Sequence, residues 1–195
     1  MRSSTVIAAI VTLLSSTPRD VTAGPYELYI GKNVLAPVGH TVFCANYPHD
    51  CSRWQGTLSF FTAGAAALYA ELYAVNREVN DAIQPALKKQ QRETTRGWTL
   101  FPALGNCNDY AVSKRHRLLL KGWPSSALQL AEVVLPSGEH HLVLLADAMG
   151  AIFVLDNLAP EPVPLADVIL YRWVRIESPD QPQYWSHISF EKVPN

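Results

Sequence analysis

The segment HHLVLLADAMGAIFVLDN, residues 140–157, contains two apolar runs separated by the turn-forming tetrapeptide DAMG. The runs are rich in β-branched and large aliphatic residues, which favours two strands joined as a hairpin. A four-residue loop at 147–150 places His141 directly opposite Asp156, whereas a three-residue loop with a bulge shifts the pairing by one residue. The segment therefore predicts an imidazole and a carboxylate within reach of each other. The alternative is two ordinary polar residues at strand ends.

Further strand-like segments lie on both sides of this hairpin. Residues 127–135, 167–176 and 183–190 are short, rich in β-branched and aromatic residues, and bounded by turn signals such as Pro-Ser-Gly. The proline-rich linker APEPVP, residues 159–164, follows the hairpin. Consecutive strands joined by short connections predict an antiparallel sheet.

Two helices are predicted before this sheet. Residues 62–84 carry apolar side chains at steps of three and four, with Thr62 as the N-cap and Pro85 as the stop. A second helix is predicted from about Cys107 to Lys121, ended by Gly122. Helices followed by hairpin-linked strands predict an α+β fold with an antiparallel sheet.

The N-terminus has the pattern of an export signal. Arg2 precedes an apolar run from Val6 to Leu14, and the small residues at 21–23 suit a cleavage site. The run is about half of the roughly 20 residues that a membrane-spanning helix needs. We expect residues 1–23 to be a signal peptide and the mature protein to be periplasmic or secreted, with no stable membrane span after cleavage. A buried N-terminal helix is the alternative.

The composition of the rest of the chain, residues 24–195, suits one globular domain. Hydrophobic residues make up 48% of the sequence, which argues against a disordered chain. The formal net charge of −1 gives no electrostatic reason to expect nucleic acid or an anionic membrane as a partner.

If the protein is exported, its three cysteines lie in an oxidising compartment, where disulfides can form. In an oxidising compartment Cys44 and Cys51 are close enough in sequence to close a short loop as a disulfide, with Pro48 and Asp50 favouring the turn. Cys107 is then left over. Such a cysteine is buried and inert, paired to another chain, or a working thiol, and composition does not choose among these.

Cys107 occupies a position that can activate a thiol. Asn106 is a good N-cap, and Asp109 three residues later approximates a capping box. Cys107 then lies in the first helical turn, where free N–H groups and the helix dipole stabilise a thiolate or an oxyanion. A thiolate nucleophile also needs a base and an orienting group, which His141 and Asp156 can supply. The alternative is a small, buried, unreactive side chain.

The other histidines are weaker candidates. His116 lies among Lys114, Arg115 and Arg117, a cluster that predicts a solvated helix face, and His140 is expected just outside its strand. No C-x-x-C or H-x-x-x-H pattern supports a zinc site.

Three segments in this order resemble the bacterial transglutaminase-like cysteine peptidases. The resemblance implies a papain-like or transglutaminase-like fold, in which the helix that begins at the catalytic cysteine packs on the sheet. It also implies that Cys107 is the nucleophile, His141 the general base and Asp156 the orienting acid of a peptidase. The substrate implied is a protein in the periplasm or at the cell surface, such as an adhesin. The segments are GNCNDYAVSKRHRLLLKGWPSSALQLAEVV (105–134), GEHHLVLLADAMGAIFVLDNL (138–158) and YRWVRIESPDQPQYW (171–185).

The sequence departs from this family around the cysteine. LapG-type members carry a pattern like D-G-D-C-E-D there and bind calcium, whereas this chain has Leu104, Asn106 and Asn108 and keeps only Asp109 as a carboxylate. Calcium is held largely by carboxylate charge, so we expect weak binding and no required cofactor. Trp98, Asn106 and Asn108 are expected to line the cleft, with a place in the core as the alternative for Trp98.

Two other functions fit the same residues. A transglutaminase or amidase uses the same triad, with an amine in place of water or with an amide substrate, and a non-catalytic binding module can keep a relic triad.

Overall fold

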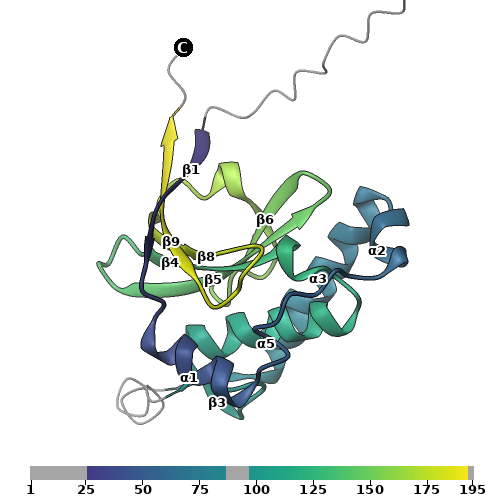
Figure 1. Ribbon diagram of the computed structural model, residues 1–195, viewed down its shortest axis with the longest axis horizontal. Helices are drawn as coiled ribbons and strands as arrows, with labels where there is room; N and C mark the ends of the chain where they lie inside the picture. The colour runs from purple at the N-terminus through teal and green to yellow at the C-terminus, as the bar shows by residue number, and fades with distance from the viewer. Residues whose placement is uncertain (1–25, 87–96, 193–195) are drawn as a thin grey trace, which may run out of the picture.

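The computed structural model describes residues 26–86 and 97–192 (Figure 1). Seven strands form one antiparallel sheet in the order β1-β9-β8-β4-β5-β6-β7, and β2 and β3 form a separate two-residue parallel pair. The predicted signal peptide, residues 1–23, lies outside the described residues. The strands are β1 (Tyr26–Val34), β2 (Gln84–Pro85), β3 (Leu104–Gly105), β4 (Leu128–Val134), β5 (His140–Ala148), β6 (Ala151–Leu155), β7 (Val163–Pro164), β8 (Arg172–Glu177) and β9 (Trp185–Lys192).

The helices α1, α3 and α5 gather on one side of this sheet, with α5 next to β5 (Figure 1). Helices and an antiparallel sheet in one unit confirm the predicted α+β class. Within the described ranges, no helix is long and apolar enough to cross a membrane. The helices are α1 (Val38–Asn46), α2 (Leu58–Thr62), α3 (Ala65–Ala82) and α5 (Cys107–Leu120), and two short 3-10 turns cover Ser125–Ala127 and Leu165–Asp167.

The sheet separates two apolar clusters because side chains alternate along each strand. On β5, Leu142 and Leu144 belong to the cluster that the helices cover. Val143 and Leu145 belong to a second cluster on the other face, which also contains Trp173. Strand β5 is therefore buried on both faces, which explains its nearly continuous apolar run.

The hairpin forms, but in a different register from the predicted one. The turn has two residues, Met149 and Gly150, both at positive φ, and Ala148 pairs with Ala151. Two positive φ values give a turn whose twist matches the strands, so the tighter loop is preferred over a four-residue one. The shift is an even number of residues and preserves the face of every side chain. His141 and Asp156 are therefore diagonal rather than directly opposite, which is still within side-chain reach.

Both ends of the long helix differ from the predicted range 62–84, because α3 runs Ala65–Ala82. The long helix begins at Ala65, and Thr62 is instead the last residue of α2, where its hydroxyl donates to Leu58 O. A short helix before Gly64 was not visible in the apolar spacing. The second predicted helix, from about Cys107 to Lys121, agrees more closely with the structure. Helix α5 runs Cys107–Leu120, and Gly122 follows it at a φ of +95°.

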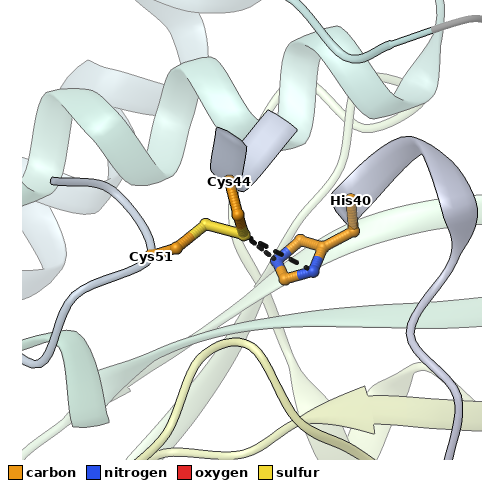
Figure 2. A group of neighbouring side chains, drawn as sticks. All are labelled: His40, Cys44 and Cys51. Atoms are coloured by element: carbon orange, nitrogen blue, oxygen red, sulfur yellow. Dashed lines mark hydrogen bonds between the residues drawn. A yellow bond between two sulfur atoms is a disulfide. The ribbon is translucent and has the colours of Figure 1, made fainter. Parts of the chain in front are cut away.

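A disulfide joins Cys44 at the end of α1 to Cys51 in the following turn, and Cys107 is free. Figure 2 shows the buried ring of His40 beside this bond, with Cys44 Sγ 3.6 Å from His40 Nε2. His40 Nδ1 accepts a hydrogen bond from Trp185 Nε1 at 3.2 Å. The half-buried disulfide thus packs against a buried histidine, whereas residues 45, 46, 48 and 49 of its loop are exposed.

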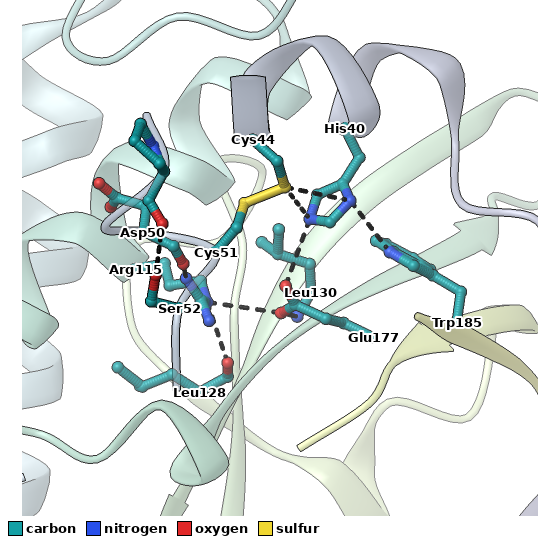
Figure 3. The surroundings of a disulfide bond; sticks show 11 residues. His40, Cys44, Asp50, Cys51, Ser52, Arg115, Leu128, Leu130, Glu177 and Trp185 are labelled. Atoms are coloured by element: carbon teal, nitrogen blue, oxygen red, sulfur yellow. Dashed lines mark hydrogen bonds and ion pairs between the residues drawn. A yellow bond between two sulfur atoms is a disulfide. The ribbon is translucent and has the colours of Figure 1, made fainter. Parts of the chain in front are cut away.

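The solvated face predicted for α5 around residue 114 is wrong. Lys114 and Arg115 are 0% and 1% exposed. Arg115 reaches from α5 to the disulfide loop and the sheet, donating to Asp50 O and Leu128 O and lying 3.4 Å from Glu177 Oε2 (Figure 3). Because α5 lies in the interior of the fold, its charged side chains are buried too. The partners of Arg115 are far from it in the sequence, so the local pattern could not reveal them.

Candidate active site

The first turn of α5 is held by a capping box. Asn106 Oδ1 accepts from Asn108 N at 3.0 Å, and Asp109 Oδ2 accepts from Asn106 N at 2.9 Å. Asp109 Oδ1 also accepts from Thr99 N at 2.9 Å. This arrangement fixes Cys107 as the first helical residue, at the positive end of the helix dipole.

Asp109 is committed to this structural role. It is 3% exposed, and each carboxylate oxygen binds a backbone N–H. Burial raises the pKa of Asp109, and the hydrogen bonds from Asn106 and Thr99 partly oppose that rise. The carboxylate that the sequence retains from the family's calcium pattern therefore binds the backbone of its own loop.

His141 and Asp156 form a buried pair. His141 Nε2 lies 2.7 Å from Asp156 Oδ1, and the two side chains are 5% and 3% exposed. The carboxylate also accepts from Leu158 N at 2.9 Å and from the Tyr171 hydroxyl at 2.7 Å. These donors fix its orientation and compensate its removal from water.

The electrostatics of this pair favour its charged form. Burial lowers the pKa of His141, but hydrogen bonds and charge from Asp156 and Cys107 outweigh it and raise the pKa to about 9. Burial also raises the pKa of Asp156, but His141, Leu158 N and Tyr171 together hold it below its usual value. Because Nε2 of His141 binds Asp156, Nδ1 is the nitrogen left for the Cys107 thiol.

Cys107 lies where two cavities meet. The cavities have volumes of about 380 and 200 Å³, and both are lined by Cys107 and His141. Asn106 lines the larger cavity, Trp98 the smaller, and Asn108 both. A half-buried thiol and an imidazole therefore share one cleft, and the buried Asp156 carboxylate binds that imidazole, which is the arrangement that nucleophilic catalysis needs.

The family model of the bacterial transglutaminase-like cysteine proteinases, BTLCP, matches residues 30–193. The chain belongs to this family. LapG of Legionella pneumophila with calcium bound is 20% identical, with a TM-score of 0.48 over 56% of this chain and 64% of that one. The EGTA-treated LapG structure is 19% identical, with a TM-score of 0.45 over 56% and 62%. The chain thus spans less than two thirds of these LapG chains. No curated protein sequence matches it.

In this BTLCP protein His140 is part of the cleft. It is the first residue of β5 rather than a residue outside the strand, and it lines both cavities. His140 Nδ1 lies 2.5 Å from Glu132 Oε1, and Arg175 binds the other oxygen of Glu132. The wall beside Cys107 is therefore polar and charged.

Tyr171 is a site residue that the sequence did not reveal. It stands immediately before β8 and contacts both members of the pair, through its hydroxyl to Asp156 and edge-on to the His141 ring with centroids 6.3 Å apart. It begins the segment 171–185 that resembles the family, but it was given no role beyond the predicted strand, and no local pattern marks such a contact.

Across the described ranges, one group of three possible metal ligands comes together: His40, Cys44 and Cys51, with ligand atoms within 4.8 Å of one another (Figure 2). The thiolate is the form of cysteine that binds metals, and both sulfurs are used in the disulfide. The disulfide accounts for this proximity.

Proposed function

We propose that this BTLCP protein is an exported cysteine peptidase, periplasmic or secreted, that uses Cys107, His141 and Asp156. His141 takes the thiol proton and the Cys107 thiolate attacks a peptide carbonyl. As the peptide C–N bond breaks, His141 gives that proton to the leaving amine, and water then hydrolyses the acyl-enzyme to a free carboxylate and the thiol. The backbone N–H of Cys107 at the start of α5 stabilises the oxyanion, since the N–H groups of Asn108 and Asp109 already bind Asn106. The observation that carries the proposal is that His141, which binds the buried Asp156 carboxylate, lines the same cleft as the free thiol of Cys107.

The cleft supports a polypeptide as the substrate. Its two cavities share the residues around Cys107 but otherwise have different walls, with Leu158 in one and Leu142 in the other. An extended chain that crosses Cys107 can place side chains in both. We propose more specifically that the substrate is a protein of the periplasm or cell surface, such as an adhesin. This part of the proposal rests on the family and on the signal-like N-terminus.

The proposal is tested by alkylating Cys107 with iodoacetamide near pH 6. An ordinary thiol with a pKa near about 8.5 is mostly protonated there, so fast labelling requires an activated pair. We expect His141→Ala to slow labelling at least about tenfold. His187→Ala removes an exposed imidazole outside the cleft and is the matched control. Equally slow labelling of wild type and His141→Ala would favour the non-catalytic binding module.

A transglutaminase or amidase on the same scaffold is the second candidate. The same triad can serve all of these reactions. They differ only in the amine that leaves the substrate and in the molecule that then accepts the acyl group, which is water or a second amine. Incorporation of a fluorescent primary amine into an uncleaved polypeptide, with release of ammonia from a glutamine side chain, would indicate transamidation, whereas release of free backbone carboxylate ends indicates peptide hydrolysis.

We further propose that the site works without calcium, because Asp109 is the only carboxylate retained and both its oxygens bind backbone N–H groups. We expect EGTA and added calcium to leave both the iodoacetamide rate and the unfolding temperature unchanged, since a bound ion would stabilise the folded state. Loss of labelling in EGTA that calcium restores would contradict this proposal.

A further inference from the structure

The smaller of the two cavities beside Cys107 has a charged wall. The neighbouring strands β4, β5 and β8 supply Glu132, His140 and Arg175 to this wall. The cavity volume of about 200 Å³ is below the roughly 300 Å³ of pockets that hold drug-sized ligands, so the cavity suits a single side chain. A side chain that enters it lies next to the thiol.

A β-bulge directs Arg175 into this cavity. On β4, Glu132 pairs with Arg175. The next residue, Val133, pairs with Trp173, so β8 has one extra residue at this point. Residues two apart on a regular strand share a face, yet Trp173 packs in the apolar cluster on the far face while Arg175 lines the cleft. The bulge thus lets β8 keep a core tryptophan and still present a guanidinium beside Cys107.

The guanidinium of Arg175 is held in place by three contacts. Its Nε donates to Glu132 Oε2, and its Nη1 donates to Leu35 O at 2.7 Å. It also lies over the Trp185 ring, 6.0 Å from the centroid. Among the described residues its Nη2 has no hydrogen-bond partner. A fixed guanidinium loses little freedom on binding a further oxygen, so these N–H groups are suited to a ligand.

The carboxylate of this wall is occupied by its neighbours. Glu132 is 13% exposed, and its Oε1 accepts from His140 Nδ1 at 2.5 Å while its Oε2 accepts from Arg175. One acid is therefore shared by two basic side chains. Glu139, by contrast, lines only the larger cavity. The two cavities thus differ in charge, and a negative group is better placed in the smaller one.

We propose that the smaller cavity is a subsite for an acidic side chain, aspartate or glutamate, of the polypeptide, and that Arg175 is its specificity-determining residue. The inference rests on the proposed function. The ligand carboxylate accepts a charge-assisted hydrogen bond from Arg175 Nη2. With Glu132, it gives the two basic side chains one acid each. A neutral amide gains less from the same contact, and a lysine is repelled by the guanidinium.

The test measures how fast short electrophilic peptides alkylate Cys107. Peptidyl chloromethyl ketones carry their chain before the reactive carbon and N-iodoacetyl peptides carry it after, so the two series reach both sides of the sulfur. Each series has glutamate, glutamine, alanine or lysine at the first or second position from the reactive group, and alanine elsewhere. Each rate is divided by the iodoacetamide rate of the same variant, which removes effects on the thiol itself.

We expect one position at which the glutamate reagent labels the wild type about tenfold faster than the glutamine reagent, with the lysine reagent slowest. Arg175→Gln should abolish this advantage. Arg53→Gln, which removes an exposed arginine of a surface ion pair, is the matched control and should keep it. Glu132→Gln should keep or raise it, because a competing carboxylate is lost.

Salt supplies a test that needs no variant and so holds if Arg175→Gln does not fold. Raising the ionic strength from about 0.05 to about 0.5 M should reduce the glutamate advantage of the wild type by at least about half. Equal rates for the glutamate and glutamine reagents at every position would overturn the inference. So would an advantage that survives Arg175→Gln or that salt leaves unchanged. Slow iodoacetamide labelling of the wild type itself would instead reject the proposed function.

Discussion

Replacing Asp156 by asparagine is expected to lower turnover of any polypeptide that the wild-type protein cleaves by about 10⁴-fold, as the same change does in Ser-His-Asp triads. The amide keeps the shape of the carboxylate, and its single oxygen can still accept from the Tyr171 hydroxyl, which binds Asp156 Oδ2. The amide NH2 then takes the place of Asp156 Oδ1, which accepts from Leu158 N and faces His141 Nε2. It removes the charge that stabilises the His141 imidazolium. It also offers an N–H where His141 needs an acceptor, and so favours the wrong tautomer.

The measurement is kcat with that polypeptide, together with near-ultraviolet circular dichroism to verify the fold. Asp167→Asn changes an exposed carboxylate and is the matched control. Combining Asp156→Asn with His141→Ala should add little to the larger single loss, because both residues serve one step. Independent, multiplying losses would mean that Asp156 does not act through His141.

The same variant should change the pH dependence of stability. The pKa of Asp156 is lowered by its partners, so its contribution is present above about pH 4 and is lost as the pH falls through the lowered value. The pKa of His141 is raised to about 9, so its contribution is complete below about pH 6.5 and is lost as the pH rises through 9. Asp156→Asn should flatten both limbs.

The sequence predicted the parts of this site that depend on local pattern. The capping residues around Cys107 follow from helix-end chemistry, and the face shared by His141 and Asp156 follows from strand alternation. The hairpin register did not follow, because a methionine at positive φ in a two-residue turn is uncommon, and Gly150 alone does not fix the loop length. The predicted register was off by two residues, and an even shift keeps each side chain on the same face of the sheet. The prediction that His141 and Asp156 lie within reach of each other therefore still held.

Other parts of the interior depend on contacts that no local pattern contains. Lys114 and Arg115 had the composition of a surface helix, yet α5 lies between α3 and the sheet. The carboxylate near Arg115 is Glu177, and the one whose charge acts on Lys114 is Asp156; both are distant in sequence. The helix α1 also escaped prediction, since its apolar residues show no clear helical spacing. Only the assembled fold shows which charges are buried.

Replacing Glu177 by glutamine is expected to cost about 3–5 kcal/mol of unfolding free energy, because it leaves a buried charge without its counter-ion. Glu177 Oε2 accepts from Leu130 N at 3.1 Å and lies 3.4 Å from Arg115 Nε, and each of the charged side chains is nearly inaccessible (Figure 3). His40 cannot replace the lost charge. Its Nδ1 accepts from Trp185, so its Nε2–H is a donor to Glu177 at 3.3 Å.

Urea unfolding followed by tryptophan fluorescence measures this loss. Asp180→Asn is the matched control, because its ion pair with Arg53 is 60–65% exposed and should contribute less than about 1 kcal/mol. Arg115→Met combined with Glu177→Gln should be less damaging than Glu177→Gln alone, since no unpaired charge then remains. Arg115 is on the helix that begins at Cys107 and also binds the disulfide loop through Asp50 O. A Glu177→Gln protein as stable as the Asp180→Asn control would therefore mean that this buried ion pair does not hold α5 against the sheet.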